Sequence, residues 1–354
     1  MYEAITIKDI ARALGLSTST ISRALRGSHE ISPETKKLVI EYAEQYNYRP
    51  NPIALSLKER RSRSIGVVVC EIANNFFSQA INGIESIAYN RGYHVIISQS
   101  HESYDREVVN VEHLSSRSVD GLLVSLSTET EKVEHFKKLH EKGLPIVFFD
   151  RVTDEIDTHK VVVDNYKGTY DAIQHLVHAG YKRIAHLASS AHLSITKERL
   201  NGYVAALTDN NITINESLIK YCNHGGMIQL EMENAVQELM QLKSRPDAIF
   251  CAGDRLTMGG ITALKSLGIK IPTDVALLGF TNSALVELME PSLSCVKQPA
   301  FEMGQTAIEL LIKLIESKRL VTEFETAVLH TEIFLRDSTP DIINQKKIKT
   351  NNTH

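Results

Sequence analysis

From residue 64 onward the chain alternates short apolar runs with stretches of helical periodicity, and this alternation limits its fold more than any other feature. Buried strands separated by helices form parallel sheets with right-handed crossovers. A first series of strands is expected at 65–70, 93–98, 121–125 and 145–149, with helices at 77–91, 105–117 and 130–142. A second series is expected at 160–163, 183–188, 248–251 and 275–279, with helices at 167–179, 196–210, 228–242 and 257–267.

Two such series in tandem predict two similar lobes around a cleft. Ligands of open α/β sheets bind beyond the carboxyl ends of the strands, which here means between the lobes. The sequence contains no G-x-G-x-x-G, phosphate loop, H-E-x-x-H or G-x-S-x-G motif. Asp150-Arg151 and Asp164-Asn165 follow strands, and they suit acid–base chemistry as well as hydrogen bonding to a polar ligand. We therefore expect binding rather than catalysis.

Two histidines are candidates for a metal site. His175 and His178 lie three residues apart on an expected helix, a spacing that one metal ion can bridge. No third ligand is evident, and such histidines usually lie at a helix surface or boundary. We expect neither a metal nor another cofactor.

The first 50 residues predict three short helices. A first helix is expected over 6–14, where apolar residues recur at helical spacing. Gly15 allows a tight turn, Ser17 caps a second helix over 18–25, and Ser32 with proline after it begins a third helix that runs through Tyr46. Two helices joined by a short glycine-containing turn form a helix-turn-helix.

The outer face of the second helix is rich in hydroxyl groups. Thr18, Ser19, Thr20 and Ser22 fit against bases and phosphates, and Arg23 supplies a forked donor suited to guanine. A helical bundle with a polar surface is the alternative. It explains these residues poorly, because Ser and Thr form surface helices less readily than Glu and Lys. The second helix is therefore predicted to contact DNA.

The charge distribution points the same way. Residues 1–63 contain 11 Lys and Arg against 7 Asp and Glu, whereas the remaining residues contain 28 against 36. A basic head on an acidic body is expected when only the head meets phosphate. Chance clustering of charges is the alternative explanation.

A short segment after the third helix suits a switch. Asn51 and Pro52 can begin a helix of under two turns before the basic stretch 59–63. So short a helix is marginal alone in water. We expect it to form only against DNA and the same segment of a second subunit, which predicts a homodimer.

The cysteines and apolar runs limit the compartment. Cys70, Cys222, Cys251 and Cys295 stand alone, as buried reduced thiols usually do. No signal-peptide pattern opens the sequence, and no apolar run approaches the roughly 18 residues that span a bilayer. We expect a cytoplasmic protein without membrane contact.

Two motifs carry a family resemblance. The run from Thr6 to Leu25, T-I-K-D-I-A-x-x-L-G-L-S-x-x-T-I-S-R-A-L, is followed by Y-x-P-N-x-x-A-x-x-L from Tyr48 to Leu57. With them the chain resembles the lactose-repressor (LacI/GalR) family, over nearly its whole length to about Thr339. The resemblance implies recognition helices in successive major grooves of a palindromic operator, and paired hinge helices that kink the central minor groove with Leu57 as wedge. The DNA-binding residues expected are Thr6, Ser17, Thr18, Ser19, Thr20, Ser22, Arg23, His29, Asn51, Ala54, Leu57 and Lys58.

The resemblance also implies the domain organisation. It implies a small all-α helix-turn-helix head and a two-lobed α/β effector domain with parallel sheets, like the periplasmic binding proteins. The expected bounds are a head at 1–50, a hinge and linker at 51–63, an effector domain at 64–339 and a polar tail at 340–354. Within the effector domain, the N-lobe is expected at about 64–163 and 294–323, and the C-lobe at about 164–293 and 324–338.

Matching positions imply the effector site. The residues expected around the cleft are Cys70, Phe76, Phe77, Ser125, Asp150, Arg199, His224, Asp254, Thr281 and Gln298. Aromatic rings can stack on a sugar or base, while the charged and amide groups can hold hydroxyls or carbonyls. Thr281 replaces an aspartate of many sugar-binding relatives, and Leu193 replaces an arginine of purine-responsive ones. We expect a sugar, sugar phosphate or sugar acid and disfavour a purine.

These expectations describe a sequence-specific transcriptional regulator, a repressor rather than an enzyme. Its operator affinity would change when an effector closes the lobes and alters the separation of the two hinges. An effector that releases DNA and one that strengthens DNA binding fit the same residues. A solute-binding protein and a sugar-processing enzyme with a DNA-binding head are the alternatives. The tail has too few apolar repeats for a tetramer-forming coiled coil and is expected to fray.

Overall fold

The computed structural model describes residues 5–48 and 61–343, and the chain divides into two compact units, Met1–Ser62 and Arg63–His354. In the first unit, described residues 5–48 form three helices, α1 (Ile7–Leu14), α2 (Thr18–Leu25) and α3 (Pro33–Gln45), within a residue of their predicted bounds. Their apolar faces meet in a small core, formed by Ile10, Ala11, Ile21, Ala24, Val39 and Ala43. The helix-turn-helix prediction is confirmed.

The ends of these helices follow from the residues that cap them. Thr6 and Asp9 form a capping box, in which each side chain accepts a hydrogen bond from the backbone N–H of the other. Gly15 ends α1 in the left-handed conformation, with φ of 64°. Ser17 and Ser32 accept hydrogen bonds from the first turns of α2 and α3.

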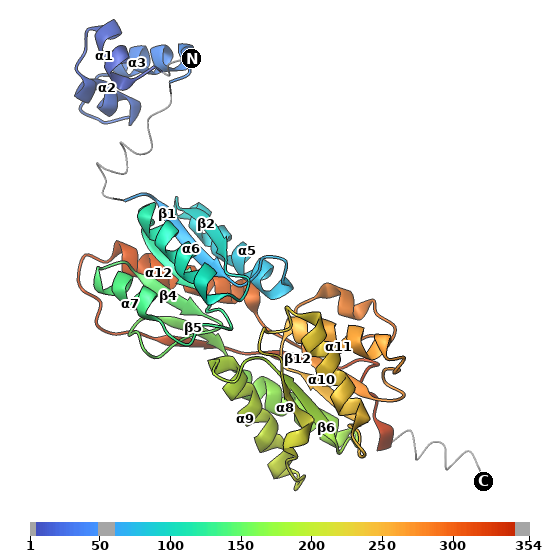
Figure 1. Ribbon diagram of the computed structural model, residues 1–354. Coiled ribbons are helices and arrows are strands. Elements are labelled where there is room, and N and C mark those ends of the chain that lie inside the picture. The colour runs from blue at the N-terminus through green and yellow to red at the C-terminus, as the bar shows by residue number, and fades with distance from the viewer. Residues whose placement is uncertain (1–4, 49–60, 344–354) are drawn as a thin grey trace. The chain divides into compact units, whose positions relative to one another are not determined.

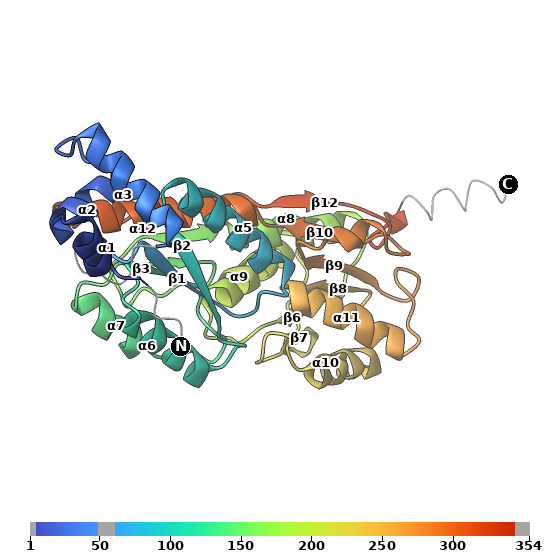
Figure 2. The same cartoon turned by 90° about the horizontal axis from the view of Figure 1, so that it is seen from above.

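The second unit contains two six-stranded sheets with helices on both faces of each (Figure 1, Figure 2). The first sheet has the strand order β11-β5-β4-β3-β1-β2 and is parallel throughout. Its strands are β1 (Ser64–Val69), β2 (His94–Gln99), β3 (Gly121–Val124), β4 (Ile146–Phe149), β5 (Lys160–Val163) and β11 (Thr326–Leu329). Its helices are α5 (Asn75–Asn90), α6 (Tyr104–Ser116), α7 (Glu134–Glu141) and α12 (Ala300–Glu316). We call this assembly the N-lobe.

The second sheet, with its helices, forms the C-lobe. Its strand order is β12-β10-β9-β8-β6-β7, parallel except for the β10–β12 pair. Its strands are β6 (Ile184–Ala188), β7 (Ile219–Tyr221), β8 (Ala248–Cys251), β9 (Ala276–Phe280), β10 (Ser294–Lys297) and β12 (Glu332–Phe334). Its helices are α8 (Asn165–His178), α9 (Ser194–Asp209), α10 (Gln229–Gln241) and α11 (Asp254–Ser266), with short 3-10 turns at Glu216–Leu218 and Ala284–Glu287.

Alternate residues of the central strands enter different cores. Val67 and Val69 of β1 pack with α5 and α12, whereas Val68 packs with α6 and α7. In the C-lobe, Ile249 of β8 packs with α10 and α11, and Phe250 packs with α8 and α9. Burial on both faces explains why these strands appear in the sequence as continuous apolar runs.

The lobe boundaries need two corrections and the strand series needs one. The strand at 160–163 was expected to begin the second series, but β5 pairs with β4 in the first sheet, in agreement with the N-lobe bounds of 64–163. The strand at 294–297, expected in the N-lobe, is β10 of the second sheet, and β11 at 326–329, expected in the C-lobe, joins the first sheet. Sheet membership depends on strand pairing across long sequence separations, which local apolar patterns do not contain.

The predicted frayed tail is wrong for its first residues. The backbone N–H of Ile342 donates to the carbonyl oxygen of Ala179 at 2.9 Å, and the Tyr181 hydroxyl donates to the carbonyl oxygen of Pro340 at 3.0 Å. Residues 340–343 therefore pack on the C-lobe at the end of α8, and residues 344–354 lie outside the described part of the chain. Among the helices of residues 5–48 and 61–343, none has the length and hydropathy of a membrane span.

Helices α5 and α12 cross at two glycines, one on each helix, so no side chain separates the two backbones at this point. A Cβ atom on Gly83 would lie 2.0 Å from the carbonyl oxygen of Phe301, and one on Gly304 would lie 2.0 Å from the carbonyl oxygen of Ala80. Both contacts are far shorter than van der Waals distance. The backbones of the two helices therefore touch, and neither position has room for a side chain.

Gly304→Ala tests this crossing. Alanine ordinarily stabilises a helix interior by about 1 kcal/mol relative to glycine. Here we expect the free energy of unfolding to fall by about 1–3 kcal/mol, because the added methyl group pushes the helices apart. Denaturant unfolding measures the change, with Glu309→Ala on the exposed face of α12 as a near-neutral control. A more stable Gly304→Ala variant would show that the helices do not touch there.

Candidate functional site

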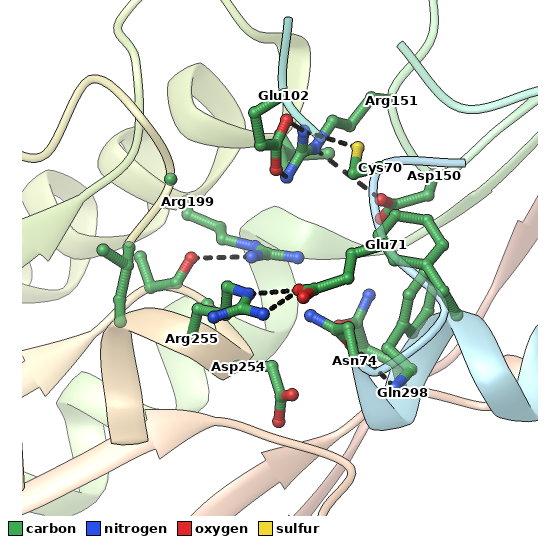
Figure 3. A pocket seen from close by; sticks show the side chains of 17 residues that line it. Cys70, Glu71, Asn74, Glu102, Asp150, Arg151, Arg199, Asp254, Arg255 and Gln298 are labelled. Atoms are coloured by element: carbon green, nitrogen blue, oxygen red, sulfur yellow. Dashed lines mark hydrogen bonds and ion pairs between the residues drawn. The ribbon is translucent and has the colours of Figure 1, made fainter. Parts of the chain in front are cut away.

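A pocket lies between the two lobes, at the carboxyl ends of strands from both sheets (Figure 3). Its lining consists of Cys70, Glu71, Asn74, Phe76, Phe77, Glu102, Asp150, Arg151, Ile195, Arg199, Gly225, Ala252, Gly253, Asp254, Arg255, Leu256 and Gln298. The space left between these side chains is about 50 Å³. One water needs roughly 10–15 Å³ by this measure, so a ligand of sugar size requires side chains or lobes to move.

The structure brings most of the predicted effector residues together. The predicted residues that line the pocket are Cys70, Phe76, Phe77, Asp150, Arg199, Asp254 and Gln298. Ser125 and Thr281 lie behind this lining, where their hydroxyls donate to Asp150 (3.4 Å) and to Asp254. His224 lies outside it, with Nδ1 2.8 Å from a Glu231 carboxylate oxygen, and its neighbour Gly225 lines the pocket instead.

The two phenylalanines begin helix α5 next to its cap. Asn74 accepts a hydrogen bond from the backbone N–H of Phe76 and so begins the helix at the pocket wall. The ring of Phe76 lies edge-on to Phe77, with centroids 5.1 Å apart, and Phe77 also packs against Phe149 of the core. Phe77 therefore belongs to the core as well as to the lining.

Arg151 and Glu102 form a buried ion pair on the N-lobe side. Arg151 donates to the two Glu102 carboxylate oxygens at 2.6 and 3.0 Å and to the carbonyl oxygen of Leu126 at 3.2 Å. Glu102 also accepts from the backbone N–H of Thr128 at 2.9 Å. These contacts compensate both charges within the lobe.

Arg199, on the C-lobe side, is buried with neutral partners. It donates to Asn165 Oδ1 at 2.8 Å and to the carbonyl oxygen of Ala252 at 2.7 Å, and its guanidinium lies 4.0 Å from the centroid of the Phe280 ring. Burial lowers the pKa of Arg199 to about 10. Burial also raises the pKa of Asp150, against the opposing influence of Arg151 and Arg199. Both groups are desolvated and suited to hydrogen bonding with a polar ligand.

Polar contacts join the lobes across the pocket. The backbone N–H groups of Asn282 and of Asn75, the first residue of α5 in the N-lobe, lower the pKa of the Asp254 carboxyl of α11. The side chain of Asn282 donates to Gln79 Oε1 at 2.8 Å, and Gln79 donates to the carbonyl oxygen of Asn282 at 3.2 Å. Burial raises the pKa of Asp254, although the Thr281 hydroxyl and these two N–H groups oppose the shift.

An ion pair also joins the lobes. Arg255 of α11 donates from Nε to Glu71 Oε2 at 2.5 Å, and its Nη2 contacts the same oxygen. Glu71 follows β1, so this pair links the end of an N-lobe strand to the first turn of a C-lobe helix (Figure 3).

Several charged residues of the lining are not among the predicted effector residues, although Arg151 was singled out as a polar group after a strand. Glu71 and Arg151 come two residues after β1 and β4, so their position after strands was a usable signal, and Arg255 is the second residue of α11. Glu102 lies in a turn after β2, where it has a left-handed φ of 64°. No local pattern marks a turn residue whose side chain points back into the pocket.

The predicted DNA-binding residues of the head lie mostly on its surface. Thr6, Ser17, Thr18, Ser19, Arg23 and His29 are exposed, and Thr20 and Ser22 are half-buried. The Ser17 hydroxyl lies 2.7 Å from that of Ser19 and 2.8 Å from that of Thr20. Asn51, Ala54, Leu57 and Lys58 lie outside the described residues.

Two arginines of α2 have partners within the head. Arg23 forms an exposed ion pair with Glu30, at 3.0 Å. Arg26, which was not predicted, donates to the Ser22 hydroxyl at 2.7 Å. Its position at the end of α2 gives this helix a second exposed cation.

Comparison with known proteins assigns both units. The family "Bacterial regulatory proteins, lacI family" matches residues 6–51, and "Periplasmic binding protein-like domain" matches residues 173–339. The HTH-type transcriptional repressor PurR of Vibrio cholerae serotype O1 (strain M66-2) is 32% identical over 342 residues, covering 95% of this chain and 98% of the relative. The chain belongs to the LacI family.

Other LacI-family proteins agree along most of the chain. Catabolite control protein A of Priestia megaterium is 30% identical over 318 residues, covering 89% of this chain and 92% of the relative. The structure titled "transcriptional regulator CelR-cellobiose complex" is 28% identical, has a TM-score of 0.70 and covers 94% of this chain and 99% of its own. A lac repressor dimer bound to operator has a TM-score of 0.80 at 23% identity, covering 96% and 100%, and supports the fold.

Family membership confirms the broad prediction. This chain is a DNA-binding transcriptional regulator with an effector-binding domain, and its relatives are regulators rather than enzymes. A solute-binding protein is excluded as an alternative, because the helix-turn-helix head is present and matches this family.

Glu102→Gln tests the buried ion pair in the N-lobe. Removing the Glu102 charge leaves the buried Arg151 with only Asp150, at 4.0 Å, as a counter-ion, so we expect the free energy of unfolding to fall by about 3 kcal/mol. The double variant Glu102→Gln/Arg151→Met removes both charges and should recover a large part of that loss. Denaturant unfolding of the three proteins gives the coupling between the residues. Additive losses would show that the pair is not coupled.

Proposed function

We propose that this protein is a repressor that binds a palindromic operator as a homodimer and responds to a carbohydrate-derived effector bound between its lobes. The observation that carries the proposal is a hydroxyl-rich, exposed α2 on the same chain as a polar interlobe pocket. The relatives support it, since they include the repressor PurR and a complex of the regulator CelR with cellobiose.

On the DNA side, each predicted residue has a role suited to its chemistry. Thr18, Ser19 and Arg23 contact base edges in the major groove from α2. Thr6 and Ser17 stand at helix N-termini, where backbone N–H groups favour phosphates. The remaining contacts come from Thr20, Ser22 and His29 in the head and from Asn51, Ala54, Leu57 and Lys58 in the hinge, with Leu57 as the minor-groove wedge.

On the effector side, the ligand binds between Asp150 of the N-lobe and Arg199 of the C-lobe. Asp150 accepts hydrogen bonds from ligand hydroxyls, and Arg199 donates to ligand oxygens. Phe76 offers an apolar edge and Gln298 an amide. Cys70 and Phe77 complete the lining, while Ser125, His224 and Thr281 support it from behind or from the rim.

The effector acts through the contacts between the lobes. A ligand changes operator affinity only if it binds two arrangements of the lobes with different affinity. The Glu71–Arg255 ion pair and the hydrogen bonds between Asn282 and Gln79 must rearrange when the lobes move, because each joins one lobe to the other. Their rearrangement moves α5 relative to α11, and in a dimer this changes the separation of the two hinge segments.

Selection of random duplexes on the purified protein tests the proposal. The selection should enrich one palindrome. Repeating it with a panel of sugars, sugar acids and sugar phosphates should identify a compound that weakens or strengthens binding to that palindrome. The direction of that change gives the sign of the effector. No enriched palindrome under any condition would overturn the assigned DNA recognition.

Arg23→Ala tests base recognition by α2. We expect the variant to lose preference at one base pair of each half-site, by about 1–3 kcal/mol. Binding to single-base variants of the operator measures the change. The control Glu30→Gln frees Arg23 from its ion pair and should leave the base preference intact. An equal loss on all sequences would make Arg23 a phosphate contact instead.

A further inference from the structure

The charges of the pocket are divided between the lobes. On the N-lobe side, the carboxylates of Glu71, Glu102 and Asp150 face a single cation, Arg151, which bonds to Glu102 and lies 4.0 Å from Asp150. On the C-lobe side the charged groups are Asp254, Arg199 and Arg255. The Asp254 carboxylate accepts a hydrogen bond from the Thr281 hydroxyl, and its one negative charge is outnumbered by the two guanidinium groups. The C-lobe wall is therefore cationic and the N-lobe wall anionic.

Among the described residues, neither C-lobe arginine forms an ion pair with a carboxylate of its own lobe. Arg199 is 3% exposed, and no carboxylate among the described residues forms an ion pair with it. Arg255 has a carboxylate partner, but Glu71 belongs to the opposite lobe. When the lobes separate, Glu71 leaves with the N-lobe, and both guanidinium groups remain on the C-lobe wall.

The Glu71–Arg255 pair also occupies the space that a ligand needs. Both side chains point into the middle of the pocket (Figure 3), where the open volume is about 50 Å³. A ligand of sugar size must displace the pair. A neutral ligand would separate the two charges without replacing either, which is costly in a partly buried site. A ligand with an acidic group replaces Glu71 as the counter-ion of Arg255.

We propose that the effector is a polyhydroxy acid, whose carboxylate or phosphate takes the place of Glu71 on Arg255 and bonds to Arg199, while its hydroxyls donate to Asp150. This inference rests on the proposed function and names the class of its effector. Glu71 then acts as an internal competitor that holds Arg255 while the pocket is empty of ligand. The Glu71 side chain is 15% exposed, so its carboxylate can turn toward solvent when displaced.

Calorimetry on the purified chain without DNA tests the inference. The probes are gluconate, glucuronate, glucose 6-phosphate and, as the neutral counterpart, glucose. We expect at least one acid to bind at least tenfold more tightly than glucose, with an affinity that falls as salt concentration rises. Comparing the affinities of gluconate and glucuronate with that of glucose 6-phosphate shows whether the site prefers a carboxylate or a phosphate.

Two variants of the same ion pair should act in opposite directions. Arg255→Gln removes the group that holds the acid, so it should weaken binding of the acid by tenfold or more. Glu71→Gln removes the competitor, so it should tighten binding of the same acid several-fold. A pair that only stabilises the closed lobes would shift both affinities in one direction. Glu238→Gln, which breaks the Lys220–Glu238 pair outside the pocket lining, is the matched control.

The inference is overturned if glucose binds as tightly as the acids, if none of the acids binds at millimolar concentration, or if both variants shift affinity in the same direction. These outcomes are separate from failure of the proposed function. If a neutral sugar binds and changes operator affinity, the repressor function stands and only the acidic class of the effector is wrong. If an acid binds but no operator is selected, the ligand class stands and the proposed DNA recognition is wrong.

Discussion

The second unit depends on the contact between α5 and α12, where Gly83 and Gly304 let two helix backbones touch. Helix α5 begins with the aromatic wall of the pocket, and α12 begins two residues after Gln298. Because the crossing holds both helices on one face of the first sheet, it fixes the N-lobe side of the pocket. Gln79 of α5 is hydrogen-bonded to Asn282 of the C-lobe, so a shift of the C-lobe acts on a helix that cannot slide alone.

The interior of each lobe and the boundary between the lobes are built from different chemistry. Each lobe has two apolar cores in which alternate strand residues are buried, whereas the contacts across the pocket are ion pairs and hydrogen bonds. Exchanging a hydrogen bond within the protein for one to water or ligand changes the free energy little, whereas opening an apolar core costs much more. The lobes can therefore move as intact bodies, and a polar ligand can replace the contacts between them.

Much of this fold could be predicted from the sequence because its signals are local. Thr6, Ser17 and Ser32 mark helix starts by their own hydrogen bonds, and strands buried on both faces appear as apolar runs. The sheet to which each strand belongs could not be predicted from such local signals. The apolar pattern of Lys160–Val163 would suit either sheet, and only its pairing with β4 assigns it to the first sheet. The effector site was predicted at strand ends. Glu102 was missed because it lies in the turn after β2, and only the conformation of that turn places its side chain in the pocket. The glycine crossing was also missed, since nothing near Gly304 in sequence indicates which helix it meets.

Both sheets receive an edge strand from one short segment. β11 pairs with β5 in the first sheet, and three residues further on β12 pairs with β10 in the second. During translation the head has all its residues long before this segment emerges, and domains generally fold as they leave the ribosome. The DNA-binding head can thus fold early, whereas neither lobe has its complete sheet until residues 326–334 are made. The nascent protein acquires its means of contacting DNA before its means of being regulated.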